Sequence, residues 1–385
     1  MRYLVLGGAG FIGHEVVHDL IRSSKFERLV VADLDGARAD ALVASAKDRR
    51  VTGARVDVAD ATALDRLARD CDVIVNCTPG HQNVEILKSA VRARVNYLDI
   101  VGSMMAEERL ALDGEARAAG TTAVIAMGCS PGLTNVLAAY GVRLLDRADE
   151  VHIEYASFRP FNPSPGFLDT ALRQYTPHVK CPVFTRGALT YVPAFSGLKT
   201  VGFPPPIGDV DLYFPPHSEV VTLSRFIPGL REVTVRGSYH PEVMRALRVF
   251  HDLGLMDETP TPIEGRTATP RALLQAILAR KPLHFGGITA YCLHVSVTGL
   301  RDGCPTTHRF TISHPADTAW SDLPQRTMTA LCTSVGAQLL ASAADLPRGV
   351  LAPEACLDPV PFIEGVAARG IIVDRRTEQR QSWGR

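Results

Sequence analysis

The chain has 385 residues, of which 46% are hydrophobic and 21% charged, and 41 Lys and Arg balance 41 Asp and Glu. This length allows more than one hydrophobic core, and the composition is that of an ordinary globular protein. The balanced charge argues against a nucleic-acid or membrane-surface partner, and no apolar run reaches the ~18 residues of a membrane span.

The eight cysteines are scattered along the chain. None forms a C-x-x-C pair and none stands at zinc-ligand spacing, so we expect no metal site. The opening residues lack the basic leader and apolar run of a secretion signal. Together these features predict a reduced, cytoplasmic protein.

Short apolar runs alternate with amphipathic stretches along the first ~130 residues. We expect strands at residues 2–7, 28–33, 51–57, 72–77, 95–100 and 121–127. We expect helices at Ile12–Ser23, Gly36–Lys47, Ala61–Arg69, Gln82–Ala93 and Ala106–Ala118. This alternation predicts an α/β fold with a doubly wound parallel Rossmann sheet that is covered on both faces.

The texture changes after residue 130. Residues 159–216 are rich in proline, which predicts loops and edge strands. Longer β-like runs and helical segments surround this stretch and predict a second α+β domain with a mixed sheet. We therefore divide the chain into a first domain at residues 1–130 and a second at 131–320, with 320–385 packing back on the first domain.

A glycine pattern stands between the first strand and the first helix. Gly8, Gly10 and Gly13 fit G-x-G-x-x-G, with Phe11 and Ile12 inside the pattern. The first glycine permits a tight turn, the second lets the backbone approach a pyrophosphate, and the third lets the helix pack closely. The helix N-terminus then offers N–H groups and a positive dipole end to phosphate.

An acidic residue follows at the end of the second strand. Asp33 lies 20 residues after Gly13, where a carboxylate accepts hydrogen bonds from the adenosine ribose and repels a 2′-phosphate. The alternative is that Asp33 only caps the next helix. NAD is therefore favoured over NADP, although Arg38 keeps NADP open. Asp57 and Val58 follow the third strand, where the adenine ring is commonly contacted.

The fourth strand ends in "NCTPG", residues 76–80. Loops at the carboxyl ends of parallel strands face the cofactor, so Asn76, Cys77 and Thr78 are expected along the nicotinamide half. Cys77 is better explained as a packing residue than as a reactive thiol, since no His or Lys is placed nearby in sequence to activate it.

The glycine loop alone also suits an extended short-chain dehydrogenase. Those enzymes need a Tyr-x-x-x-Lys pair, in which the lysine lowers the tyrosine pKa. No tyrosine of this chain has a lysine four residues later. This alternative therefore lacks its catalytic pair.

Four other segments carry a resemblance that covers most of the chain. They are "NCTPGHQNVEILKSAVRARVNYLDIVG", "ARAAGTTAVIAMGCSPGLTNVLAAYG", "VRGSYHPEVMRALRVFHDLGLMDE" and "GVLAPEACLDPVPFIEGVAARGI". The chain resembles the saccharopine dehydrogenase-like oxidoreductases, with a layout most similar to the lysine 6-dehydrogenases. The resemblance implies an NAD(P)-dependent enzyme that acts on the C–N bond of an amino acid or an amino-acid-derived imine, in a direction that the sequence leaves open.

The resemblance also implies site residues at the end of the first domain and the start of the second. Asp99 ends the fifth strand and is expected to contact substrate or nicotinamide, the alternative being a cap for the helix near Ala106. Gly132 and Asn135 belong to "SPGLTN", which is expected to lie beside the nicotinamide and to offer free helix N–H groups to an anion or amide. The alternative is a plain capped helix.

Arg236 and His240 are the candidates on the second domain. The arginine would hold a substrate carboxylate and the histidine would exchange protons, the alternative being a surface histidine. Two other functions stay open, namely a carbonyl or alcohol oxidoreductase on the same scaffold and a non-catalytic NAD-binding regulator. The resemblance also implies that the first domain binds NAD and that the second carries the substrate contacts and forms a homodimer.

Overall fold

A computed structural model describes residues 1–102, 106–161, 164–280, 289–314, 323–343 and 345–380. The chain forms two compact units. Unit 1 consists of Met1–Tyr140, Val221–Pro228 and Arg326–Ile371, and unit 2 consists of Gly141–Val220, Gly229–Gln325 and Ile372–Arg385.

Unit 1 contains a seven-stranded sheet in the order β17-β6-β5-β4-β1-β2-β3, in which all neighbours are parallel. The strands are β1 (Arg2–Leu6), β2 (Arg28–Asp33), β3 (Val51–Arg55), β4 (Val73–Asn76), β5 (Asn96–Asp99), β6 (Thr122–Val124) and β17 (Gly349–Leu351). Their runs of Val, Leu and Ile are buried because helices cover the sheet. The predicted doubly wound parallel sheet is confirmed.

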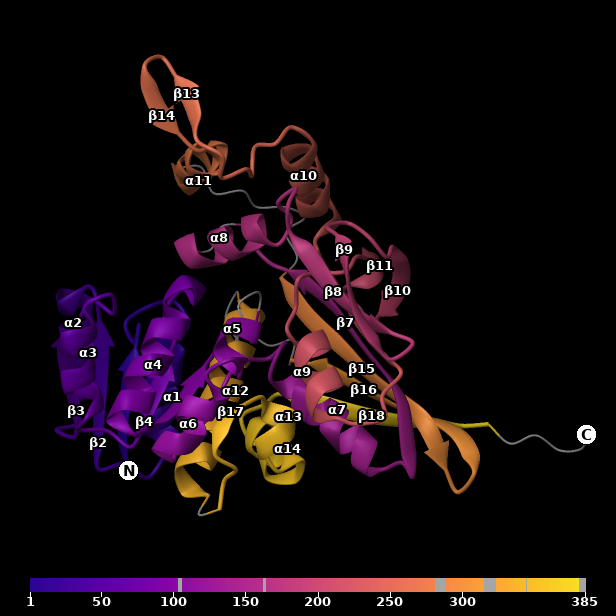
Figure 1. Cartoon of the computed structure of the whole chain (residues 1–385), viewed down its shortest axis with the longest axis horizontal. Helices are drawn as coiled ribbons and strands as arrows, with labels where there is room; N and C mark the ends of the chain where they lie inside the picture. The colour runs from indigo at the N-terminus through magenta and orange to yellow at the C-terminus, as the bar shows by residue number, and fades with distance from the viewer. Residues whose placement is uncertain (103–105, 162–163, 281–288, 315–322, 344, 381–385) are drawn as a thin grey trace, which may run out of the picture. The chain divides into compact units, whose positions relative to one another are not determined.

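The helices of unit 1 flank this sheet (Figure 1). They are α1 (Gly13–Ser23), α2 (Gly36–Ala46), α3 (Ala61–Ala68), α4 (Asn83–Ala93) after the 3₁₀ turn η1 (Gly80–Gln82), α5 (Ala106–Leu110), α6 (Asp113–Ala119), α12 (Pro324–Ser342), α13 (Pro353–Cys356) and α14 (Pro359–Ala367). The helix expected at 106–118 is two helices, α5 and α6. One apolar core joins α3, α4, α5 and α6 to the sheet.

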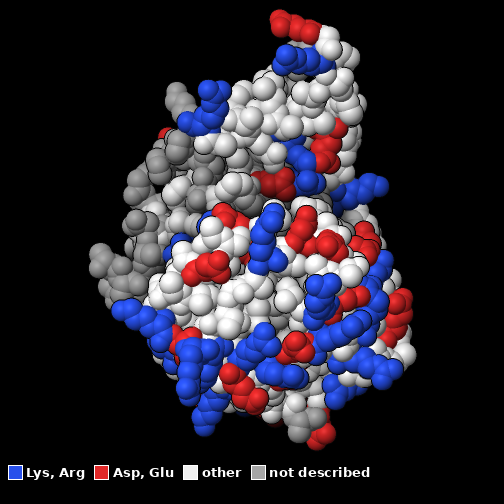
Figure 2. All heavy atoms as spheres, turned by 90° about the vertical axis from the view of Figure 1, so that its left-hand side faces the viewer, with Lys and Arg blue, Asp and Glu red and all other residues white. Residues whose placement is uncertain are grey.

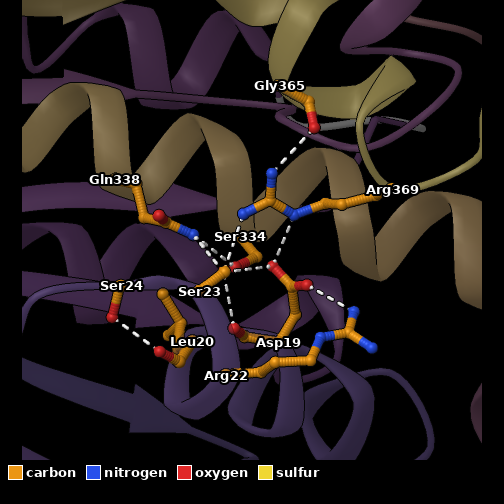
Figure 3. A network of polar contacts seen from close by, with 9 residues as sticks. All are labelled: Asp19, Leu20, Arg22, Ser23, Ser24, Ser334, Gln338, Gly365 and Arg369. Carbon is orange, nitrogen blue, oxygen red and sulfur yellow. Dashed lines mark hydrogen bonds and ion pairs between the residues drawn. The ribbon is translucent and has the colours of Figure 1, made fainter.

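A polar network ties the late segment of unit 1 to its first helix (Figure 3). Asp19 of α1 accepts hydrogen bonds from Arg369 Nε at 2.8 Å and from Arg22 Nη2 at 2.9 Å. Arg369 also donates to Ser23 Oγ and to the Gly365 carbonyl, each at 2.7 Å. Because the carboxylate is 2% exposed, these contacts replace water around a buried charge.

Unit 2 contains a seven-stranded mixed sheet in the order β18-β16-β15-β7-β12-β8-β9. The strands are β7 (Arg147–Phe158), β8 (Lys180–Thr185), β9 (Ala188–Pro193), β12 (Glu232–Tyr239), β15 (Ala290–Arg301), β16 (Cys304–Ser313) and β18 (Ile372–Gln379). β7 and β12 are parallel, and the other pairs are antiparallel. The predicted mixed sheet of a second domain is confirmed.

Two hairpins and several helices complete unit 2. The hairpins pair β10 (Lys199–Phe203) with β11 (Gly208–Leu212) and β13 (Thr261–Ile263) with β14 (Arg266–Ala268). The helices are α8 (Pro165–Arg173), α10 (Pro241–Asp252) and α11 (Pro270–Arg280), while α7 (Leu133–Arg143) and α9 (Glu219–Phe226) each continue from one unit into the other. The expectation of only loops and edge strands at 159–216 misses α8, where Ser164 caps the helix and Pro165 occupies its first turn.

Within the described residues, no helix combines the length and apolarity needed to cross a bilayer. Figure 2 shows one face of the molecule, on which Lys and Arg are interspersed with Asp and Glu. That this protein binds no nucleic acid remains a prediction.

Candidate dinucleotide and substrate sites

The glycine loop forms a tight cradle between β1 and α1. Gly7 has φ +65°, so the left-handed residue of the turn is Gly7 and not the predicted Gly8. Gly10 N donates to the Gly7 carbonyl at 2.9 Å. A Cβ on Gly13 would lie 2.1 Å from the same carbonyl oxygen, so only glycine allows α1 to begin this close to the loop. Any side chain at these positions would fill the cradle. Its glycines therefore leave the space that a pyrophosphate site requires.

The two residues inside the glycine pattern anchor the loop to its own unit. Ile12 is the residue before α1 and is buried. The Phe11 ring lies 5.0 Å from the guanidinium carbon of Arg326. Their contribution to cofactor binding remains a prediction.

Asp33 interacts directly with the glycine loop. Its Oδ2 accepts from Ala9 N at 3.1 Å and its Oδ1 accepts from Asp35 N at 3.1 Å. The helix cap is Asp35, which accepts from Arg38 N at 3.1 Å, so the alternative that Asp33 caps α2 is wrong. Arg38 Nη2 donates to the Ala9 carbonyl at 2.7 Å, which fixes the loop from the other side.

A hollow opens beside these groups at the end of β2. It is lined by Asp33, Leu34, Asp35, Gly36, Ala37, Arg38 and Arg55. In a Rossmann sheet this position receives the adenosine ribose. The residues present therefore fit a dinucleotide, with two carboxylates and two arginines around the place where a 2′-hydroxyl or a 2′-phosphate would lie.

Asp57 lies after β3, and its Oδ1 accepts from Ala59 N at 3.0 Å. The side chain is exposed. Val58 packs partly buried against the core of unit 1. An adenine contact by these two residues remains a prediction.

At the end of β4 the predicted polar residues bond mainly to one another. Asn76 is fully buried and its Nδ2 donates to Asn83 Oδ1 and to Tyr97 Oη, each at 3.0 Å. Asn76 Oδ1 accepts from Thr78 N at 3.0 Å and from Thr78 Oγ1 at 2.6 Å. These four bonds fix the shape of the loop, since a buried amide must find partners within the protein.

The Cys77 thiol between these residues is not prepared for nucleophilic chemistry. Desolvation, with a smaller contribution from the charge of Asp99, raises the pKa of Cys77 to about 12. A thiol with so high a pKa carries almost no thiolate at neutral pH. This supports the interpretation of Cys77 as a packing residue.

Asp99 is held inside unit 1 by a buried ion pair. Arg109 Nη1 donates to Asp99 Oδ1 at 2.6 Å and to Oδ2 at 2.7 Å, and both side chains are fully buried. Asp99 also accepts from Tyr97 Oη at 3.0 Å and from the backbone N of Ala126 at 2.9 Å. The alternative, that Asp99 caps the helix near Ala106, is therefore wrong. The Asp99 oxygens instead join α5 and the segment after β6 to the end of β5, which is the geometry of a framework residue.

The "SPGLTN" turn also uses its polar groups internally. Gly132 N donates to Asn135 Oδ1 at 2.9 Å, Leu133 N to the Gly128 carbonyl at 3.0 Å and Thr134 N to the Cys129 carbonyl at 3.1 Å. The expectation of free N–H groups at this helix start is therefore wrong. The buried Asn135 in turn donates Nδ2 to Thr222 Oγ1 and to Glu354 Oε2, at 3.1 and 2.9 Å.

In unit 2, Arg236 and His240 lie four residues apart, the first within a strand and the second at the start of a helix. Arg236 lies on β12 and donates Nε to the Gly197 carbonyl at 2.9 Å and Nη1 to Thr234 Oγ1 at 3.1 Å. Burial lowers the pKa of Arg236 from its ordinary value, which Glu154 and Glu232 partly offset. His240 caps α10, with its Nδ1 accepting from Glu242 N at 3.4 Å.

Unit 2 also brings together three ionisable side chains that the sequence analysis missed. Tyr155 Oη and His217 Nε2 lie 3.3 Å apart, and His217 Nδ1 lies 3.2 Å from Glu219 Oε2. The Tyr155 and His217 rings are stacked with centroids 5.1 Å apart. All three residues are buried. The Nδ1–Oε2 contact has the distance of an ion pair but not the geometry of a hydrogen bond, whereas the phenol and the imidazole are hydrogen-bonded. A histidine between a carboxylate and a phenol is a candidate for proton exchange.

Comparison with known protein families gives matches over most of the chain. A family model described as the saccharopine dehydrogenase NADP binding domain matches residues 3–124, and one described as the saccharopine dehydrogenase C-terminal domain matches residues 128–371. The chain belongs to the saccharopine dehydrogenase family. The resemblance found in the sequence is thus confirmed, as is the expectation of an oxidoreductase that uses a nicotinamide cofactor.

Relatives within and around this family are similar over nearly their full length. The chain is 21% identical to carboxyaminopropylagmatine dehydrogenase from Synechocystis, with 96% of each chain covered. It is 23% identical to carboxynorspermidine synthase from Vibrio cholerae, with 94% of each covered. The structure of apo saccharopine dehydrogenase (L-Glu forming) from Saccharomyces cerevisiae shares the fold, with a TM-score of 0.72, 16% identity and coverage of 98% of this chain and 99% of the other.

One group of side chains in this family member could hold a cation. Glu150, His152 and Glu232 bring their ligand atoms within 4.8 Å of one another, and each is partly exposed. His152 Nδ1 lies 2.7 Å from Thr234 Oγ1, which occupies one ring nitrogen. Exposed carboxylates beside a histidine occur commonly without a metal, so this group adds nothing to the function.

Proposed function

We propose that this saccharopine dehydrogenase family member oxidises the C–N bond of an amino acid or an amino-acid-derived amine, or runs the reverse reductive condensation. The observation that carries the proposal is the match of both family domains to nearly the whole chain. The names of the similar Synechocystis and Vibrio proteins refer to carboxylated amines and support the same substrate class.

The proposed reaction balances as follows. A carbon bearing a secondary amine loses a hydride and its nitrogen loses a proton, which gives an imine. Water adds to the imine carbon and the C–N bond breaks, releasing a carbonyl compound and an amine. Bound nicotinamide dinucleotide supplies the hydride acceptor, and the chain must supply groups that take up and return the protons.

We propose His217 as the residue that exchanges these protons, through Tyr155. Glu219 orients the imidazole and stabilises its protonated form, as a carboxylate does in other buried histidine pairs. His240, the residue proposed from sequence, is the second candidate because its Nε2 is not used in capping α10. Asp99 is not proposed for proton transfer, because its oxygens already accept from protein donors.

We propose NAD as the preferred cofactor. Asp33 accepts from the glycine loop and places a carboxylate beside the ribose position, which disfavours a 2′-phosphate. Arg38 already donates to the Ala9 carbonyl. NADP is the second candidate, because Arg38 and Arg55 both line the hollow and could bind a phosphate.

The test is a turnover assay of the full chain with NAD or NADP against a panel of amino acids, N-carboxyalkyl amines and alcohols. The proposal expects amine-dependent reduction of NAD and a preference that shifts towards NADP in Asp33→Ser. Turnover of alcohols alone would establish the carbonyl oxidoreductase, and tight NAD binding without any turnover would establish the regulator.

A second assay separates the two histidines. His217→Asn and Glu219→Gln should each lower kcat at least 100-fold and change the pH–rate profile, since general acid–base groups contribute roughly 10²–10⁴ in rate. His240→Asn should leave the profile unchanged. The reverse pattern would transfer the role to His240.

We also propose that unit 2 forms a homodimer. Apolar side chains are exposed at the end of α10 and on α11, among them Leu253 directly after α10 and Ile277 on α11. Light scattering coupled to size exclusion distinguishes a dimer from a monomer, and Leu253→Glu should weaken a dimer formed through α10.

A further inference from the structure

One arginine of unit 2 is buried without a counter-charge. Arg159 directly follows β7, and only 6% of it is exposed. Tyr239 is the last residue of β12, the parallel neighbour of β7. Its partner across the two strands is Ser157, two residues before Arg159. Both residues therefore lie at the carboxyl edge of the parallel pair, where polar groups of α/β sheets commonly meet their ligands.

The hydrogen bonds of Arg159 use one side of its guanidinium. Nη1 donates to the Pro160 carbonyl at 3.1 Å and contacts the Phe161 carbonyl at 3.5 Å. The buried Nε has no hydrogen-bond partner. Among the described residues no carboxylate forms an ion pair with Arg159. Nη2 also donates to none of the described residues, so the Nε and Nη2 edge, which can bind both oxygens of a carboxylate, is unused there.

Aromatic rings replace part of the missing hydration. The guanidinium carbon lies 4.7 Å from the Phe167 ring centroid and 4.8 Å from the Tyr239 ring centroid. Such contacts favour a cation but supply no hydrogen-bond acceptor. The Tyr239 hydroxyl donates to Gln174 Oε1 at 2.9 Å, and among the described residues no hydrogen bond joins it to Arg159.

A buried guanidinium with an unsatisfied N–H is costly unless something completes it. Arg236 on β12 differs from Arg159. Its Nε and Nη1 both donate to neutral oxygens of the protein, and its side chain is only half-buried. We propose that Arg159, and not Arg236, binds the carboxylate of the substrate through Nε and Nη2. This inference rests on the proposed function, because it presupposes a substrate that carries a carboxylate.

The probe is glutarate, compared with the isosteric diamide glutaramide, titrated into the full chain without cofactor. Ligand-detected NMR measures the dissociation constant. Arg159→Gln should weaken glutarate binding about 10- to 100-fold, the loss expected for charge-assisted hydrogen bonds. Glutaramide should bind weakly to both proteins. Glutarate binding within twofold of wild type in Arg159→Gln, or equal binding of glutaramide, would overturn the proposal.

Arg248 supplies the matched control, since its guanidinium carbon also lies over an aromatic ring of unit 2, 3.8 Å from the Phe195 centroid, but the residue is exposed. Arg248→Gln should leave glutarate binding unchanged.

Should Arg159→Gln not fold, ¹⁵N-arginine labelling of the wild type provides the readout. The Arg159 Nε–H signal, assigned with Arg159→Lys, should move downfield on glutarate addition, and a static signal would overturn the proposal.

The two proposals can fail separately, because this binding assay needs neither cofactor nor turnover. Glutarate binding through Arg159 in a protein that oxidises no amine would overturn the proposed function and support the anion site. Amine oxidation with unchanged glutarate affinity in Arg159→Gln would overturn the anion site alone.

Discussion

Polar side chains at the strand ends of the two units differ in what they contact. In unit 1, Asp99, Asn76 and Asn135 bond to other side chains and to backbone of their own unit. In unit 2, Arg159 keeps an unused N–H, and His217 Nδ1 has no hydrogen-bond partner among the described residues, although Glu219 lies at ion-pair distance from it. A polar residue at the end of a strand can therefore serve only to hold the neighbouring loops in place. A residue whose hydrogen-bonding groups lack partners in the protein is a better candidate for ligand contact.

The largest effect that would test this comparison is expected from Asp99→Asn. The substitution leaves the buried Arg109 guanidinium without its carboxylate, and breaking a buried pair costs about 3–5 kcal/mol in the free energy of unfolding. Urea denaturation followed by circular dichroism measures this loss.

Asp70→Asn is the control for Asp99→Asn, since Asp70 is exposed and should change stability by less than about 0.5 kcal/mol. A variant Asp99→Asn with wild-type stability but strongly reduced kcat would contradict the framework role. It would also restore Asp99 as a site residue.

A smaller effect should follow from Gly237→Ala in unit 2. A Cβ at this position would lie 2.0 Å from the Tyr155 ring, so the ring that contacts His217 must move. Overpacking of this kind costs about 1–3 kcal/mol. Thermal and urea unfolding measure the cost, and kcat should fall with it if Tyr155 transmits protons.

Gly166→Ala serves as the comparison for Gly237→Ala. Nothing lies within 4 Å of a Cβ at Gly166 in α8, so this substitution should stabilise the protein slightly. In addition, the cost of Gly237→Ala should shrink in a Tyr155→Val background, because the clashing ring is removed. An undiminished cost would show that the ring is not the cause.

Most of the fold could be predicted because it follows from local patterns. Alternating apolar strands and amphipathic helices predict the parallel sheet of unit 1, and glycines at fixed spacing predict the loop at Gly13. The split between α5 and α6 was not predicted, since both segments carry one continuous amphipathic pattern. Helix α8 does not follow from the sequence pattern because clustered prolines indicate loops, although proline is also favoured in a first helical turn.

The candidate site was less predictable because it depends on contacts between distant residues. Tyr155 and His217 are 62 positions apart, and nothing local indicates that their rings stack. The only local signal was the spacing of His217 and Glu219 two residues apart in "PPHSEV", just before α9. Likewise, the satisfied bonds of Asp99 depend on Arg109 and Ala126, which a motif at "NYLDIVG" does not specify.

The smallest expected effect concerns the framework of unit 1 and its dependence on pH. Burial raises the pKa of Asp19, but hydrogen bonds from Ser334 and Arg369 outweigh burial and hold it below 3.8 (Figure 3). A depressed folded pKa contributes stability that is present above the unfolded pKa and is lost as the pH falls through the folded value. Asp19→Asn should therefore lower the free energy of unfolding by about 1 kcal/mol at pH 7, roughly one net hydrogen bond. The difference from wild type should shrink as the pH falls below about 4, whereas Asp70→Asn should show no such convergence. Urea titrations at several pH values measure it, and a difference that stayed constant down to pH 3 would mean that the Asp19 charge contributes nothing to the link between α1 and Arg369.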